Sequence, residues 1–166
     1  MPLHTRRAPR PRSGSAAVEF AFVMPILLTL MLGVWEFGRL IEAQQIISNA
    51  AREGSRLASA GFKTATDVDT AVKNYMSNAG LNTTGYTVRV YNLSTNPSPA
   101  PGAASDDPTA ATQLQHLQVI VTLPVNNVKW LFANKVLSSK TKLTGIAEWF
   151  SMKDQPLIVD SSMPSS

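Results

Sequence analysis

The chain has 166 residues and a formal net charge of +4, and its excess positive charge lies at the amino end. This length corresponds to about one domain of ordinary size. The absence of cysteine excludes disulfides and thiolate metal sites. From Ser15 onward, eleven basic residues balance eleven acidic ones. The excess belongs to a leader over residues 1–14, so it does not mark a nucleic-acid-binding surface spread over a folded domain. The leader holds four arginines and no acid: Arg6, Arg7, Arg10 and Arg12.

A continuous apolar run follows the leader. Of the 22 residues at positions 16–37, only Glu19, Thr29 and Glu36 are polar. As a helix, this run would be about 33 Å long, enough to cross the roughly 30 Å hydrocarbon core of a bilayer. The apolar core of a cleaved secretory signal is shorter, about 7–15 residues, with small residues close behind it. The sequence therefore predicts a retained transmembrane helix over residues 15–38, mildly kinked at Pro25.

The flanking charges predict the orientation of this helix. Four arginines precede it, whereas Arg39 is accompanied by Glu36 and Glu42 after it. An excess of Lys and Arg marks the cytoplasmic side, and Trp35 stands where an interfacial indole would lie at the far end. For a bacterial chain, we expect a single-pass inner-membrane protein with a cytoplasmic amino terminus, a periplasmic remainder and membrane lipid as a partner.

Glu19 is a charged residue inside this apolar run, and it has two interpretations. A glutamate in the first helical turn interacts favourably with the amide end of the helix dipole and can reach lipid headgroups. Its spacing suggests a more specific role, because Glu19 is the fifth residue after Gly14 and Phe20 follows it. This arrangement, behind a basic leader and ahead of an apolar run, resembles the class III signal of type IVb prepilins.

The stretch "GSAAVEFAFVMPILLTLMLGVWEFGR", together with the later "NAAREGSRLASAG", resembles the TadE-like family. These are pilin-like proteins of tight-adherence (Flp) pilus systems. The resemblance covers about residues 13–61. It implies cleavage by a membrane prepilin peptidase between Gly14 and Ser15, which would remove the leader. It also implies that the Glu19 carboxylate, with Phe20 beside it, serves recognition and assembly by pairing with the terminal amine of a neighbouring subunit.

After the apolar run the pattern becomes amphipathic, which predicts that the same helix extends into the periplasm over residues 39–60. One narrow apolar stripe follows a 3-4 spacing. Its members are Leu40, Ala43, Ile47, Ala50, Gly54 and Leu57. The stripe could pack on the chain's own domain or on partner helices in an assembly.

The segment "NAAREGSR" resembles a charged box of the same family. Arg52 and Arg56 are four residues apart and repel each other slightly, and Glu53 cannot face both. Gly54 lowers helix propensity by about 1 kcal/mol relative to alanine, so it marks either close contact with another backbone or a bend. The box shows no catalytic geometry.

We expect residues 61–150 to form a small α+β head at the end of the long helix, an arrangement broadly like that of pilins. A short helix starts at Thr66, with Val68, Val72, Tyr75, Met76 and Ala79 on one face, and stops at Gly80. Alternating residues predict about three antiparallel strands, in "GYTVRVYN", "QHLQVIVTLPV" and "SSKTKLTGIAEWF". The segment "NNVKWLFANKVL" reads as a short helix or an irregular turn. A flexible loop is expected at about residues 93–113 and a frayed tail at 151–166.

Nothing in the sequence indicates an enzyme, a metal site, a cofactor, a nucleic-acid ligand or a small-molecule substrate. His116 begins a strand and is expected to be at the surface or half-buried, and Asp106 and Asp107 are expected to be solvated in the loop. Asn82 and Asn92 match the glycosylation pattern, which is frequent by chance.

Three functional hypotheses follow. The favoured one is a minor pilin or pseudopilin-like component of a tight-adherence pilus, acting in pilus biogenesis, adhesion and surface colonisation. Its partners would be the prepilin peptidase and other pilin-like subunits, and it would stay in the inner membrane or enter the extracellular filament. The second is an uncleaved, signal-anchored envelope protein whose periplasmic head binds a partner. The third is a membrane-tethered enzyme.

Overall fold

The computed structural model describes residues 13–128 and 141–154, which form one long helix, a shorter helix and a three-stranded sheet. The helices are α1 (Ser13–Ser59) and α2 (Ala65–Asn78). The strands are β1 (Thr87–Asn92), β2 (His116–Pro124) and β3 (Lys142–Phe150), and the short 3-10 helices are η1 (Pro108–Ala110) and η2 (Val125–Asn127). The predicted α+β class, with a long amino-terminal helix, a short helix and three antiparallel strands, is confirmed.

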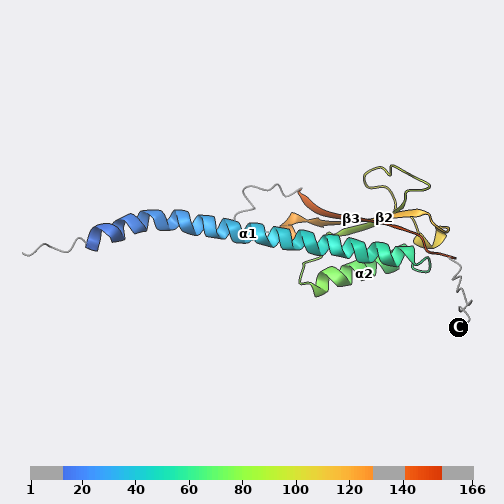
Figure 1. Ribbon diagram of the computed structural model, residues 1–166, viewed down its shortest axis with the longest axis horizontal. Helices are drawn as coiled ribbons and strands as arrows, with labels where there is room; N and C mark the ends of the chain where they lie inside the picture. The colour runs from blue at the N-terminus through green and yellow to red at the C-terminus, as the bar shows by residue number, and fades with distance from the viewer. Residues whose placement is uncertain (1–12, 129–140, 155–166) are drawn as a thin grey trace, which may run out of the picture.

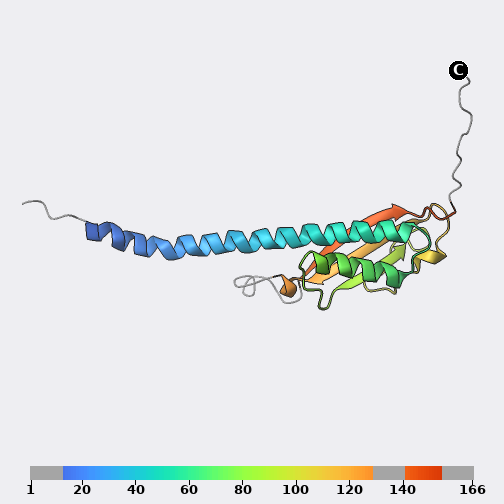
Figure 2. The same cartoon turned by 90° about the horizontal axis from the view of Figure 1, so that it is seen from below.

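α1 is the axis of the molecule, and the head is built on its carboxyl-terminal half (Figure 1). Its 47 residues correspond to a length of about 70 Å. The helix continues through Pro25, and its amino-terminal part is gently curved in Figures 1 and 2. Thr29 donates a side-chain hydrogen bond of 2.7 Å to the Pro25 carbonyl. The helix begins at Ser13, slightly before the residues 15–38 expected from the apolar run.

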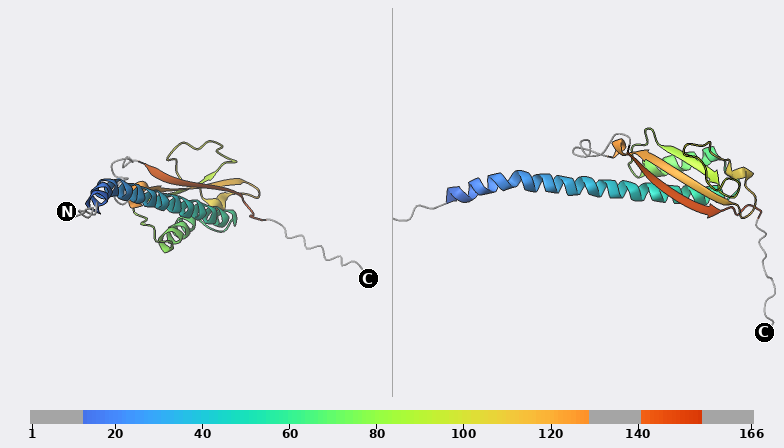
Figure 3. Two further views of the ribbon diagram at one scale, coloured as in Figure 1. Left: turned by 60° about the vertical axis from the view of Figure 1, so that its left-hand side comes forward. Right: turned by 90° about the horizontal axis from the view of Figure 1, so that it is seen from above.

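The sheet has the strand order β1-β2-β3, and both pairs are antiparallel. β2 lies in the centre of the sheet. Successive side chains of a strand point to opposite faces, and the odd-numbered residues of β2 face the helices while its even-numbered residues face outward. α1 and α2 lie side by side against one face of the sheet, as Figures 2 and 3 show, and leave the other face to the loops. Val119, Val121 and Leu123 of β2 are completely buried beneath the two helices.

The predicted apolar stripe of α1 forms the centre of this core. Ala43, Ile47, Ala50 and Gly54 are buried, and the ends of the stripe, at Leu40 and Leu57, are half-buried. Further buried residues of the helix are Ala51, Ser55 and Ala58. Of the two interpretations of the stripe, packing on the chain's own domain is therefore correct. Small residues predominate in it because two helices and a sheet converge there.

α2 starts one residue earlier than expected and has a capping box at its amino end. Thr64 accepts a hydrogen bond from the Asp67 amide, and the Asp67 carboxylate accepts one from the Thr64 amide. These hydrogen bonds, from the Thr64 backbone first and its hydroxyl second, lower the pKa of Asp67. The resulting stabilisation is present above the ordinary pKa of aspartate and is lost as the pH falls through the lowered pKa.

The buried face of α2 is narrower than expected. Val68, Val72 and Met76 are fully buried, but Tyr75 and Ala79 are exposed. The helix ends close to the predicted stop, and Gly80 has a positive φ of 79° just beyond it. Tyr75 and Ala79 share the predicted 3-4 spacing but lie outside the buried face, because the spacing describes a wider stripe than the rest of the head covers.

The loop at residues 93–113 is attached to the free edge of β1. The Asp106 amide donates a hydrogen bond to the Val90 carbonyl, and the Asp106 carboxylate accepts one from the Asn92 amide, both 2.8 Å long. Asp106 is therefore half-buried and structural, and the expectation that it is solvated was wrong. Asp107 is exposed, as expected, and caps η1 through the Thr109 amide. The flexibility of the loop stays a prediction.

Residues 151–154 belong to the folded head, in contrast to the expected frayed tail. Ser151 is completely buried and exchanges backbone hydrogen bonds with Leu114 and Gln115 beside β2. The Met152 amide donates to the carbonyl of Ser59 at the end of α1, and Lys153 Nζ donates to the Thr109 carbonyl. The remainder of the predicted tail lies outside the described residues, as do most of "NNVKWLFANKVL" and the leader up to residue 12.

Gly145 of β3 allows the sheet to approach α1 at backbone distance. A Cβ atom built there would lie 2.6 Å from the carbonyl oxygen and 2.8 Å from the carbonyl carbon of Ile47. Ile47 is itself fully buried, and its backbone is held in the helix, so it cannot move aside as a side chain would. The separation of α1 and β3 thus depends on the missing side chain.

We expect Gly145→Ala to destabilise the full-length protein in detergent by about 1–3 kcal/mol, because α1 and β3 must move apart. The control is Gly38→Ala, whose added Cβ meets no atom within 4 Å. Chemical denaturation followed by the fluorescence of Trp149 on β3, with the other two tryptophans replaced by phenylalanine in both proteins, would measure the difference. Equal midpoints for the two variants would contradict this account of the α1–β3 contact.

Candidate functional site

The candidate site is the amino-terminal part of α1, which carries the predicted cleavage and assembly residues. Gly14 lies in the first turn of the helix and is exposed. Glu19 and Phe20 are exposed one turn further along. Since residues four apart share one face of a helix, Ser15 and Glu19 stand one above the other. The structure thus places the predicted residues within about two turns, at the end of α1 opposite the head.

The same part of α1 presents an apolar surface that no other part of the described chain covers. Fourteen large apolar side chains between Val18 and Ile41 are exposed, from 45% at Met24 to 75% at Phe22. α1 is long and apolar enough to cross a membrane, and none of its most hydrophobic window is buried. Apolar surface of this extent marks a site of contact with lipid or with other proteins. The segment therefore fits a single-pass membrane anchor.

The charged box, Arg52 to Arg56, lies 33 to 37 residues beyond Glu19, inside the head, and its residues have separate roles. The Arg56 guanidinium donates two hydrogen bonds, of 2.6 and 2.9 Å, to the Glu53 carboxylate. Arg52 donates instead to the Asn49 side chain, at 3.1 Å. The hydrogen bond from Arg56, with its charge, holds the pKa of Glu53 below its usual range. An exposed ion pair of this kind contributes little to stability.

Gly54 faces the interior while the charged members of the box face solvent. A Cβ atom there would lie 2.8 Å from Val72 Cγ2 on α2 and 3.2 Å from Val119 Cγ1 on β2. The structure therefore selects close packing over a bend as the reason for this glycine, because α1 continues straight through it as one helix. Contact with another backbone was one of the two expected explanations. The atoms that a Cβ atom at Gly54 would meet belong to side chains instead.

These positions agree with the comparison with protein families. Residues 14–56 match the model of the TadE-like proteins, so the match begins at Gly14 and ends at Arg56 of the charged box. The chain thus carries a TadE-like segment, and the resemblance inferred from sequence is confirmed over that range. The match covers 43 of the 166 residues of the chain. The comparisons with curated proteins and with solved structures gave no match.

The matched segment lies entirely within α1. It joins the exposed apolar part of the helix to the part that forms the core of the head. α2 and the sheet lie outside the match, so the family comparison assigns no role to them.

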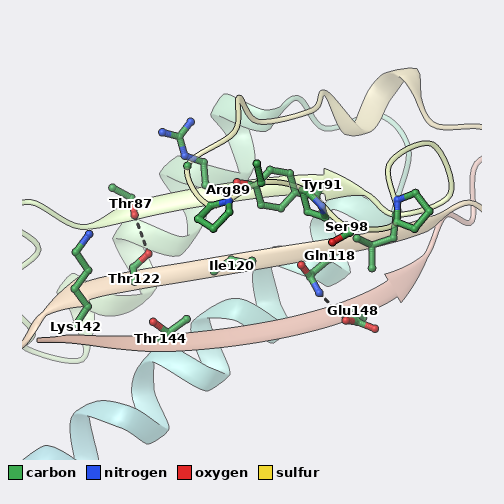
Figure 4. Close-up of a pocket in the computed structure, with 16 residues that line it drawn as sticks. Thr87, Arg89, Tyr91, Ser98, Gln118, Ile120, Thr122, Lys142, Thr144 and Glu148 are labelled. Carbon is green, nitrogen blue, oxygen red and sulfur yellow. Dashed lines mark hydrogen bonds between the residues drawn. The ribbon is translucent and has the colours of Figure 1, made fainter.

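The outer face of the sheet carries a groove that the sequence analysis did not predict (Figure 4). The groove has a volume of about 720 Å³ and lies between the three strands and residues 97–102 of the long loop. Thr87 and Thr122 share a hydrogen bond of 2.8 Å in it, and the Gln118 amide donates to Glu148 at 2.7 Å. The alternation in the strands indicated which side chains face outward. Only the register of the sheet decides which of these side chains lie next to one another.

The groove shows no arrangement that indicates catalysis. His116 lies beside it, half-buried as expected, with its Nε2 3.0 Å from Glu148 Oε2 and its ring stacked on Phe150 at 4.9 Å. Among residues 13–128 and 141–154, no group of three or more His, Asp or Glu side chains could hold a metal ion. The groove is lined by hydroxyl, amide and charged side chains of the strands and by proline and other apolar residues of the loop.

The two asparagines of the glycosylation pattern differ in accessibility. Asn92 is 8% exposed and donates its side-chain amide to Gln115, so the folded protein does not present it for modification. Asn82 is exposed, and its side-chain oxygen accepts hydrogen bonds from the amide and hydroxyl of Thr84.

The packing of Gly54 gives a prediction that separates its structural role from that of the surrounding charges. We expect Gly54→Ala to lose about 1–3 kcal/mol to overpacking against Val72, partly offset by the roughly 1 kcal/mol gain in helix propensity. Gly38→Ala, with open space around it, should show only the gain. Denaturation midpoints of both full-length variants in detergent would test this. A Gly54→Ala protein as stable as Gly38→Ala would contradict the close-packing explanation.

Proposed function

We propose that this protein is a minor pilin or pseudopilin-like component of a tight-adherence pilus. The observation that carries the proposal is the TadE-like match over α1, the helix that bears an exposed apolar anchor at one end and a folded head at the other. The chain would act in pilus assembly, and through the pilus in adhesion and surface colonisation. Its partners would be a prepilin peptidase and other pilin-like subunits.

The first step in this role would be removal of the leader. Cleavage between Gly14 and Ser15 would create a new amine on Ser15 and leave α1 with an almost uninterrupted apolar end. The bond lies in the first turn of α1, where backbone amides lack partners within the helix, so this turn can open at low cost. Glycine lowers the helix propensity of the turn further and adds no side chain next to the bond.

The second step would be association through Glu19. A carboxylate within a membrane-spanning segment is costly and is retained when it has a functional partner. Ser15 and Glu19 share one face of α1, so the new amine and the carboxylate would be exposed along the same line. A neighbouring helix displaced by about one turn along its axis would bring its Ser15 amine level with this Glu19.

The orientation expected from the flanking charges completes the proposal. Four leader arginines would hold the amino end in the cytoplasm, and the head would lie in the periplasm. The second candidate, an uncleaved anchored protein, is supported by the groove on the outer face, because such a hollow suits a partner-binding head. The two candidates differ in the amino terminus of the mature protein.

Cleavage is the first prediction. Expressed with a cognate prepilin peptidase, the chain should lose its first 14 residues and begin at Ser15, as read by amino-terminal sequencing. Gly14→Leu should block cleavage, whereas Gly14→Ala should be partly cleaved because alanine is small. Gly38→Leu is the matched control, since it adds the same side chain to an exposed glycine at the far end of the span. An intact leader on the unaltered chain, with the peptidase shown to be active, would reject the processed-pilin proposal.

Association through Glu19 gives the second prediction. Glu19→Gln should insert and be cleaved, but it should no longer co-purify with partner subunits or support pilus production. Removing one member of a buried ion pair costs about 3–5 kcal/mol. Loss of a charge that only interacts with a helix dipole costs about 0.3–1 kcal/mol. Glu36→Gln, at the other end of the span, is the control and should assemble normally. Normal pili with a correctly cleaved Glu19→Gln protein would leave only the helix-dipole interpretation.

Topology is tested separately. A reporter that is active only in the periplasm, fused after Phe150 at the end of β3, should be active. A second reporter that is active only in the cytoplasm, fused at the same position, should be silent. The reverse pattern would show that the head is cytoplasmic and would exclude both candidate functions.

A further inference from the structure

The distance between the end of the apolar run and the start of the head is short. The run ends at Phe37, and Ala43 is the first residue of α1 buried in the core, six residues further on. α1 is continuous across this junction, so the separation along its axis is about 9 Å. The polar layer of each leaflet is about 5–8 Å thick. The head therefore begins at the level of the headgroup layer, because residues 79–81 already lie beside Arg39 and Glu42, and no linker separates the two.

A defined part of the head lies at this level. Ala79, Gly80 and Leu81, at the end of α2, and Val128, after η2, line a hollow of about 200 Å³ together with α1. On α1 the hollow is lined by Arg39, Glu42, Ala43 and Ile46. The side chain of Asn127 donates to the carbonyls of Asn82 and Thr84, which fastens the two loops of this end together. We call residues 79–82 and Asn127 the base surface, and Val128 is buried beneath it.

We propose that the base surface rests in the phospholipid headgroup layer while α1 spans the membrane. This inference rests on the membrane anchoring in the proposed function and adds a second contact with lipid, made by the head. Figure 1 shows the near end of the head directly beside α1, with the exposed part of the helix continuing away from it. A helix tilt of about 20°, usual for membrane helices, shortens its span only slightly and lowers one side of the head further.

The proposed contact between the base surface and the headgroup layer depends on the short distance along α1 and not on charge. Near the junction, Arg39 and Lys142 are exposed, but Glu42 is exposed at the same level and Glu36 lies one turn below. Among the described residues at this level, opposite charges in equal number suit a zwitterionic headgroup layer. We therefore expect the base surface to contact phosphatidylcholine as well as anionic lipid, with little dependence on salt.

The absence of cysteine in the chain makes a direct test practicable. Three single-cysteine variants of the full-length protein would be labelled with a fluorophore and reconstituted into phosphatidylcholine vesicles. Ala79→Cys reports the base surface, Ser98→Cys reports the exposed loop on the outer face, and Met31→Cys reports the apolar run. Each would be measured with lipid quenchers placed in the headgroup and deep in the acyl chains.

We expect the headgroup quencher to remove most of the fluorescence at position 79 and little at position 98, and the deep quencher to act at position 31. A seven-residue helical insertion after Gly38 raises the head by about 10 Å and nearly preserves its rotation, so it should abolish quenching at position 79. Quenching at 31 without quenching at 79, quenching at 79 only with anionic lipid, or quenching that survives the insertion would each overturn the inference and leave the proposed function intact. Absence of quenching at position 31 would overturn the membrane anchoring itself.

Discussion

The backbone contact between α1 and β3 is the constraint on which the rest of the structure depends. Gly145 lets β3 lie against the Ile47 carbonyl, and this contact sets the distance between the sheet and the helix. With that distance fixed, α2 can pack beside α1 only where Gly54 leaves space for Val72. Small residues along α1, and not large ones, therefore determine how the head is assembled.

Because of this contact, one helix carries both the exposed apolar segment that fits a membrane anchor and the centre of the core. The lower half of α1 exposes its large apolar side chains, and the upper half buries alanine, glycine and isoleucine against the sheet. Each residue advances a helix by about 1.5 Å, so in a continuous helix the position of the apolar segment along the axis fixes the position of the head. The head therefore cannot change its height above the membrane without moving the anchor or bending the helix.

The TadE-like match and the fold divide the molecule differently. The match ends at Arg56, near the end of α1, and covers both the exposed and the buried halves of the helix. The sheet, by contrast, contributes the groove on the outer face and the contact of the half-buried His116 with the exposed Glu148. Association in the membrane would accordingly depend on α1, and any recognition by the head would depend on the outer face of the sheet.

Much of this could be predicted from the sequence, because the relevant signals are local. The uninterrupted apolar run predicted the anchor, the 3-4 spacing predicted the buried face of α1, and the alternation in residues 116–124 predicted the central strand. The spacing of Gly14, Glu19 and Phe20 suggested the family before any comparison was made. Each of these signals depends only on residues that are neighbours along one helix or strand.

Other features depend on contacts between residues that are distant in the sequence, and only the tertiary structure decided them. The sequence gives no sign that Gly145 has a special role, because its contact is with the distant Ile47. Ser151 was expected to begin a frayed tail, but it forms a hydrogen bond with the distant Leu114. Asp106 was expected in solvent because its neighbours in the sequence are polar. In the structure its carboxylate accepts a hydrogen bond from the Asn92 amide, at the edge of the sheet. By itself, the sequence determined the anchor, the elements and their buried faces. The distances between those elements, and hence the groove and the height of the head, followed only from how the elements pack together.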